Sequence, residues 1–405
     1  MKKRFFVNTI LILFVLGITG CAKEPPKEEK KQKQELLLWS YYETEAQKEG
    51  LDRLVNGFNN SQRIYRISWE YVPMVDFVKR LSIALSSDSL PDLVLLDNSD
   101  MESLIKSEML EDITDPLQSR VFVDNYYKEV WDSVEYNGRY YGVPFGCNNT
   151  VILYNRQMFR QTGVNVPVTW DEFRKAAKAL TKTEGEPHYG FAMSAFSGEQ
   201  GASQFMPWIF ATGATAENLA DERAVAAFEL LEDLLESGCM PHDCMNWSQN
   251  DLTRVFVERK VAMIENISGA LPEIKASGID YGIFSFPSYV TQGVVIGGES
   301  LAVIQGKDVD GAIAFMDYYN QEEVMEEISE IMWNIPPKKE LAEAYAEKNE
   351  DMRAFVSQME EGVSKASIPQ WREVRSALSE SLYQSFGSSN PAEEIWEEYL
   401  AKIEE

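Results

Sequence analysis

The sequence is poor in the residues that build nucleophilic, metal-dependent and nucleic-acid-binding sites. Its 405 residues include two histidines and four cysteines, and 38 basic side chains stand against 65 acidic ones. A chain with a formal net charge of -27 repels phosphate backbones, so nucleic acid is not an expected partner. The only long apolar run lies within the first 20 residues, which argues against a protein with several membrane spans.

The motifs of nucleotide binding and of nucleophilic catalysis are also missing. Neither G-x-G-x-x-G nor G-x-x-x-x-G-K-[ST] follows a predicted strand. His188 and His242 are far apart and lie in no Ser/His/Asp or Cys/His pattern. We therefore predict a protein without enzymatic activity and without a cofactor. A pair of carboxylates suited to glycoside hydrolysis stays possible among so many acidic residues.

Four cysteines are too few for a disulfide framework. Cys239 and Cys244 are close enough for either two thiols or one short disulfide, and Cys147 would then be left over. Because the chain has no second Cys/His pair at a zinc-like spacing, we predict no metal site around His242.

The amino end is typical of an exported protein. Lys2, Lys3 and Arg4 precede an apolar stretch, and residues 1–20 are predicted to be a signal peptide. The stretch ends in ITGC, which resembles the bacterial lipobox, so Cys21 is predicted to be lipidated. Residues 21–35 then form a lipidated cysteine and a flexible tether, because residues 22–35 show no apolar periodicity.

The next sixty residues alternate strand and helix patterns. Apolar runs or alternations at residues 36–39, 67–71 and 93–96 predict strands. Between them, apolar residues recur at helical spacing over 51–58 and 77–85. This βαβαβ order predicts an α/β fold with a buried parallel sheet.

Polar and aromatic side chains follow the first and third of these strands. In a doubly wound sheet the ligand lies beyond the carboxyl ends of the strands. We therefore select Trp39, Tyr41, Glu43, Asp97 and Asn98 as candidate ligand-binding residues. The alternative roles are helix capping for Asp97 and Asn98 and core packing for Trp39.

Several segments resemble a known family when they are read in order. The segments are YNGRYYGVP (136–144), LYNRQMF (153–159), PVTWDEF (167–173), FVERKVAMI (256–264), GGESLAVI (297–304) and IPQW (368–371). Together they resemble the family 1 extracellular solute-binding proteins, the sugar-binding lipoproteins of ABC importers that are related to maltose-binding protein. The resemblance covers nearly the whole chain after the tether.

The resemblance implies two Rossmann-like α/β lobes joined by a multi-segment hinge, a type II periplasmic-binding-protein-like fold. Residues 36–146 and 287–319 would form the first lobe, and residues 147–286 and 320–405 the second. The ligand would lie in the cleft between the lobes, and an ABC permease would recognise the closed form. The expected protein is a monomer on the outer face of the cell membrane.

Sugars pack their C–H faces on aromatic rings and pair their hydroxyls with carboxylates and amides. The crossing segment contributes Asn148, whose alternative role is a turn amide. Glu299 follows paired glycines that allow a ligand to approach the backbone. From the second lobe we select Trp208, Asn266 and Trp371, the last because the resemblance places a stacking ring there.

One departure from the family pattern concerns the ligand. Where maltose-binding relatives have a Gly-Pro-Trp turn, this chain continues through residues 266–271 as NISGAL. The stacking ring of that turn is missing, so the ligand is expected to differ from a maltodextrin in length or pose. A non-sugar solute such as a peptide or a polyamine is the alternative ligand.

Overall fold

The structure is a computed structural model that describes residues 33–87, 89–120 and 125–403. The predicted signal peptide, Cys21 and nearly all of the predicted tether lie outside these residues. Strand β1 (Gln34–Ser40) begins before the predicted start at residue 36 and so includes the last two residues of the predicted tether. The pairing of Gln34 and Glu35 with β2 explains this difference.

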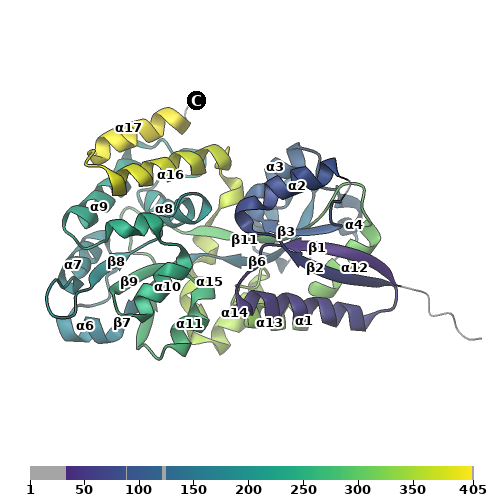
Figure 1. Cartoon of the computed structure of the whole chain (residues 1–405), viewed down its shortest axis with the longest axis horizontal. Helices are drawn as coiled ribbons and strands as arrows, with labels where there is room; N and C mark the ends of the chain where they lie inside the picture. Colours follow the sequence, from purple (N-terminus) through teal and green to yellow (C-terminus); the bar gives the residue numbers. More distant parts are fainter. Residues whose placement is uncertain (1–32, 88, 121–124, 404–405) are drawn as a thin grey trace, which may run out of the picture.

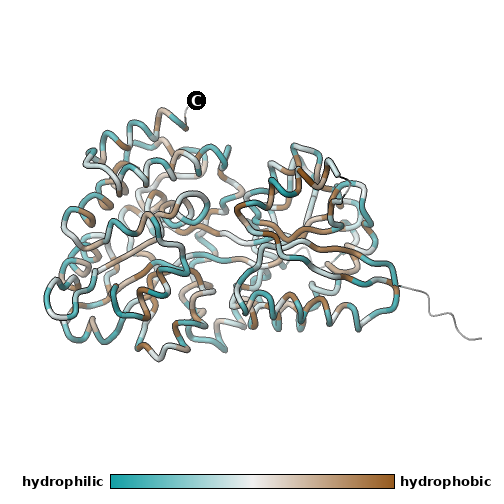
Figure 2. Tube along the Cα trace, in the orientation of Figure 1, coloured by the Kyte–Doolittle hydropathy of each residue, from teal (hydrophilic) through white to brown (hydrophobic). Residues whose placement is uncertain are grey.

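The first lobe is built on a sheet whose three parallel strands were predicted from their apolar patterns. Parallel strands β1, β2 (Tyr65–Tyr71) and β3 (Leu93–Asp97) are extended by the antiparallel strand β11 (Val295–Val303). Every residue of β3 is buried, as the continuous apolar run predicts. Figure 2 shows hydrophobic residues along these central strands.

Helices connect the strands and cover the sheet of this lobe (Figure 1). Helix α1 turns its buried side chains, among them Leu51, Leu54 and Phe58, toward the sheet. The helices and short strands of this part are α1 (Glu45–Ser61), α2 (Phe77–Ser86), α3 (Met101–Lys106), α4 (Thr114–Gln118), α5 (Lys128–Asp132), β4 (Glu135–Tyr136), β5 (Arg139–Tyr140), α12 (Val309–Tyr319) and α13 (Glu322–Met332).

The second lobe has its own sheet, with the strand order β10-β7-β9-β8 in the described residues. Its strands are β7 (Thr150–Asn155), β8 (Tyr189–Ala192), β9 (Val261–Ile267) and β10 (Tyr281–Phe284). Its helices are α6 (Arg156–Thr162), α7 (Trp170–Leu180), α8 (Glu199–Ala211), α9 (Val225–Glu236), α10 (Gln249–Val257), α11 (Leu271–Ala276), α14 (Lys339–Lys348), α15 (Arg353–Ser357), α16 (Trp371–Gly387) and α17 (Ala392–Ile403). Figure 1 shows α16 and α17 on the outer side of this lobe.

In the described residues, the main crossings between the two apolar cores lie between Phe145 and Cys147, between Ile296 and Leu301, and between Met332 and Ile335. In addition, Tyr127 and Val130 pack in the second core, although their neighbours Tyr126 and Trp131 belong to the first. The division expected at 146/147 stays a prediction, and it falls between Phe145 and Cys147. The other two divisions, drawn at 286/287 and 319/320, precede the changes in packing. Strands β6 (Gly142–Asn148) and β11 pair across this connection (Figure 1).

Helix α13 explains the later position of the third crossing. Its buried side chains Met325, Ile328 and Met332 belong to the core of the first lobe. The division expected from the sequence places residues 320–405 in the second lobe. The helix follows the first lobe because it packs on α1, and Gly50 of α1 leaves the space that Met332 fills.

Other predictions about the chain concern cysteines, metals and membranes. Cys147, Cys239 and Cys244 are free thiols, and all are buried, so the short disulfide is not formed. Within the described residues, no group of three or more His, Cys, Asp or Glu side chains is arranged to hold a metal ion. No helix in the described ranges has the length and apolar character needed to span a membrane.

Candidate functional site

A cavity of about 330 Å³ lies between the lobes, beyond the carboxyl ends of β1, β2 and β3. The second lobe supplies the opposite wall through the amino ends of α8 and α10 and the adjoining ends of β7 and β9. The lining side chains that argue for a ligand are polar or aromatic: Tyr41, Glu43, Tyr71, Asp97, Asn148, Glu199, Gln200, Gln249, Asn250, Glu299 and Lys365.

The register of the first sheet brings two carboxylates to the cavity. Glu299 of β11 lies opposite Asp97, the last residue of β3. Gly298 has a φ of 145°, and a Cβ there would lie 2.2 Å from the carbonyl oxygen of Gly146. The glycine is therefore required for β11 to approach β6 and hold Glu299 in this place.

Two tyrosine hydroxyls donate to Glu299. Tyr41 Oη lies 3.2 Å from Oε1, and Tyr42 Oη lies 2.9 Å from Oε2. Burial raises the pKa of Glu299 to about 7, and the negative charge of Asp97 acts in the same direction. A side chain with this pKa holds its proton in part at neutral pH. A cation beside it would favour the ionised form.

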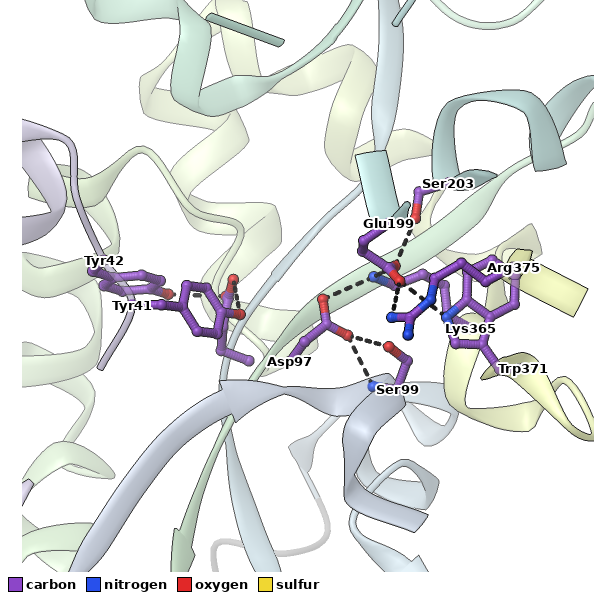
Figure 3. Close-up of polar contacts among 10 residues, drawn as sticks. Tyr41, Tyr42, Asp97, Ser99, Glu199, Ser203, Lys365, Trp371 and Arg375 are labelled. Atoms are coloured by element: carbon purple, nitrogen blue, oxygen red, sulfur yellow. Dashed lines mark hydrogen bonds and ion pairs between the residues drawn. The ribbon is translucent and has the colours of Figure 1, made fainter. Parts of the chain in front are cut away.

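A buried network of charges around Lys365 joins the two lobes. The Lys365 ammonium lies 2.9 Å from Asp97 Oδ2 of the first lobe and 2.5 Å from Glu199 Oε1 of the second. Figure 3 shows Lys365 between these carboxylates. Lys365 follows β12 (Val363–Ser364), which pairs with the second-lobe end of β11. The ion pair with Asp97 therefore connects the two lobes.

Glu199 is held by more donors than any other carboxylate shown in Figure 3. Ser203 Oγ, Trp371 Nε1 and Arg375 Nη1 all donate to it, at 2.8, 3.1 and 3.1 Å. Burial alone would raise the pKa of Glu199, but Lys365, Ser203 and Arg375 lower it to about 2. Burial would likewise lower the pKa of Lys365, yet its two carboxylate partners raise it above its usual range.

The predicted ligand-binding residues fall into two groups in the structure. Those that line the cavity together are Tyr41, Glu43, Asp97, Asn148 and Glu299. Glu43 is exposed at the rim, where its Oε2 accepts a hydrogen bond of 3.1 Å from Tyr71 Oη. Tyr71 also lines the cavity and keeps 41% of its surface exposed, so its ring is available to a ligand.

The other five residues lie outside the wall of this cavity. Trp39 packs in the first core beneath Arg80. Asn98 is buried beside a different pocket, and its Oδ1 has no partner in the described residues.

The remaining three belong to the second lobe and are all buried. Trp208 lies in the core and donates from Nε1 to Glu265. Asn266 donates to Gln249 O and Thr253 Oγ1. Trp371 reaches the site only through its hydrogen bond to Glu199. The Trp371 ring, which was expected to stack on a sugar, therefore holds the Glu199 carboxylate in place.

Sequence reasoning missed Lys365, Glu199 and Tyr42. Lys365 is the single charged residue of the segment 363–369, whose other residues are small or apolar, and this isolation is the sequence signal that could have pointed to it. Glu199 follows Gly198, which has a positive φ and begins α8. Tyr42 adjoins the selected Tyr41, but nothing local in the sequence shows that both hydroxyls reach one carboxylate.

Comparison with known proteins identifies the family. Residues 53–354 match the family described as bacterial extracellular solute-binding protein. The chain belongs to this family. It is 23% identical to the sn-glycerol-3-phosphate-binding periplasmic protein UgpB of Rhizobium meliloti (strain 1021), over 84% of this chain and 86% of that protein. It is 23% identical to the multiple sugar-binding protein of Streptococcus mutans serotype c, over 79% of this chain and 80% of that protein.

Solved structures confirm the predicted fold of this solute-binding protein. An ABC transporter solute-binding protein from Thermotoga lettingae TMO, bound with alpha-D-tagatose, superposes with a TM-score of 0.80 at 18% identity. The similarity covers 92% of this chain and 99% of that one. The fold is that of the type II periplasmic binding proteins, and the resemblance found in the sequence is confirmed. Members of this family are extracellular proteins that bind solutes, and the Thermotoga protein is the solute-binding protein of an ABC transporter.

Proposed function

We propose that this solute-binding protein captures a mono- or oligosaccharide in the cavity between its lobes and delivers it to an ABC permease. It does so as a monomer anchored to the outer face of the cell membrane by a lipid on Cys21. Binding proceeds without any bond being made or broken in the sugar. The anchor is supported by the signal-like residues 1–20 and the ITGC that ends them.

One observation carries the proposal of a sugar ligand. Rings and planar polar groups from both lobes line the same cavity: Tyr41, Tyr71 and Glu43 from the first, and Gln249 and Asn250 from the second. Carboxylates and amides pair with hydroxyls, and aromatic rings pack against the C–H faces of a sugar. Closing the lobes around a ligand would remove both its faces from water.

A thermal-shift screen followed by calorimetry tests this proposal. The chain without residues 1–20 is incubated with sugars, amino acids, peptides and polyamines, because a ligand that binds the native state raises the midpoint of unfolding. We expect a carbohydrate to give the largest shift and to remain unchanged in composition after incubation. A peptide or polyamine that binds while every carbohydrate fails would refute the proposal, and so would turnover of a glycoside.

Replacing Tyr71 by alanine is expected to weaken the carbohydrate found in that screen by about 0.5–1.5 kcal/mol, the range of one aromatic contact. The ring lines the cavity and is 41% exposed, so its removal should leave the fold intact. Isothermal titration calorimetry measures the change. Tyr383→Ala removes a ring that is 64% exposed and does not line the cavity, and it should bind as the wild type does. Equal affinities in all three proteins would remove Tyr71 from the site.

A further inference from the structure

The wall of the cavity is acidic. Among the described residues that line it, Lys365 is the single basic side chain, whereas Glu43, Asp97, Glu199 and Glu299 are carboxylates. The ammonium of Lys365 is already held by Asp97 and Glu199. An anionic ligand would find no unpaired cation in this wall and would lie against carboxylates. Like charges at short range disfavour binding.

Helix amino ends are the other groups that commonly bind anions. Helices α1, α8 and α10 all begin at this cavity, but their first turns are occupied by groups of the chain itself. Thr44 Oγ1 accepts from the backbone N–H of Gln47 at α1. Ser248 and Asp251 form a capping box at α10, and Glu199 lies in the first turn of α8. A phosphate would therefore compete with the protein's own acceptors at the ends of α1 and α10, and it would meet the Glu199 carboxylate at the end of α8.

Two of the four carboxylates are not neutralised by a cation. Glu299 accepts from the hydroxyls of Tyr41 and Tyr42, and Glu43 accepts from Tyr71. Neither forms an ion pair within the parts of the chain that the structure describes. The rings of Tyr41 and Tyr71 lie in the same wall, and the face of a tyrosine ring attracts a cation. Hydroxyl-pairing groups, rings and unpaired carboxylates thus surround one cavity.

We propose that the ligand is an amino sugar, whose ammonium group binds at Glu299 and Glu43 while its hydroxyls and ring faces meet the other lining residues. This inference rests on the proposed function, because it assigns a charge to the carbohydrate proposed above. Neutral sugars would bind through the same hydroxyl contacts but without the ionic one. Phosphorylated sugars and glycerol phosphates would be excluded.

Matched ligands that differ only in charge test the proposal. Calorimetry at pH 7.5 compares a hexose, its 6-amino-6-deoxy analogue and its 6-phosphate in the gluco, galacto and manno series. A primary alkylamine of this kind stays protonated at that pH, as lysine does. Cellobiose against the fully deacetylated chitobiose extends the comparison to a disaccharide, and sn-glycerol 3-phosphate and spermidine serve as charged ligands that are not sugars.

We expect the amino member of at least one series to bind at least about tenfold more tightly than its neutral counterpart, and the phosphates not to bind. Glu299→Gln and Glu43→Gln should each reduce that preference to about threefold or less. Glu49→Gln removes one charge from an exposed position of α1 outside the cavity, and it should keep the full preference. This control separates the effect of the site from the effect of net charge.

The outcomes distinguish this inference from the proposed function. A neutral or phosphorylated sugar that binds as tightly as its amino analogue overturns the inference and leaves the carbohydrate function standing. A tenfold preference that survives in both Glu299→Gln and Glu43→Gln also overturns it. Binding of spermidine in the absence of binding by any sugar contradicts both, as does the failure of every carbohydrate to bind.

Discussion

Replacing Lys365 by methionine is expected to lower the free energy of unfolding by about 3–5 kcal/mol at pH 7. Methionine has a stem of similar length but carries no charge, so Asp97 and Glu199 lose the ammonium that lies between them. Glu199 keeps Arg375, whereas Asp97 keeps only the hydrogen bonds from Ser99. Removing one partner of a buried pair is costly because the other charge remains without solvent or counter-ion.

Urea denaturation, with the slope m compared between proteins, measures this loss. Lys402→Met is the matched control, since Lys402 forms an ion pair with Glu380 on the surface, and its removal should change the unfolding free energy by less than about 1 kcal/mol. Adding Asp97→Asn to Lys365→Met should recover part of the loss, because an amide does not leave a buried charge. A loss for Lys365→Met no larger than that for Lys402→Met would contradict the role assigned to the network.

The first sheet could be predicted because its signals are local. The apolar run at residues 93–96 becomes the fully buried β3, and the helical spacing of Leu51, Leu54 and Phe58 becomes the buried face of α1. The crossings between lobes could not be placed in the same way. Strand β11 is buried along its whole length, so its apolar pattern does not show that its two ends lie in different cores.

The site was predictable only where topology fixed the side chain. Tyr41 follows β1 and Asp97 ends β3, and the rule that ligands lie beyond the ends of parallel strands places both residues at the cavity. Residue type alone was a poor guide, since Trp39 and Trp208 are core residues. Lys365 could not be inferred, because its partners Asp97 and Glu199 are 268 and 166 positions away in the chain.

Glu299→Gln is expected to stabilise the ligand-free protein by about 3 kcal/mol at pH 8. The pKa of Glu299 is raised by burial from an ordinary value of 4.5 to about 7, so the folded protein holds this proton more tightly than the unfolded chain does. The free energy of unfolding therefore falls as the pH rises from about 4.5 to about 7, and it stays at the lower value above that range. Glutamine keeps the shape of the side chain and can still hydrogen-bond Tyr41 and Tyr42, but it has no proton to lose.

The expected signature is a difference that depends on pH. Urea denaturation at pH 5 and at pH 8 should show the variant close to the wild type at pH 5 and clearly more stable at pH 8. Glu49→Gln, which changes an exposed carboxylate of the same charge, should stay within about 0.5 kcal/mol of the wild type at both values. A constant gain at both pH values would mean that the effect comes from packing and not from ionisation. The Glu299 carboxylate lowers the stability of the ligand-free protein above neutral pH. An amino sugar would offset this loss, because its ammonium group supplies the positive charge that the carboxylate lacks.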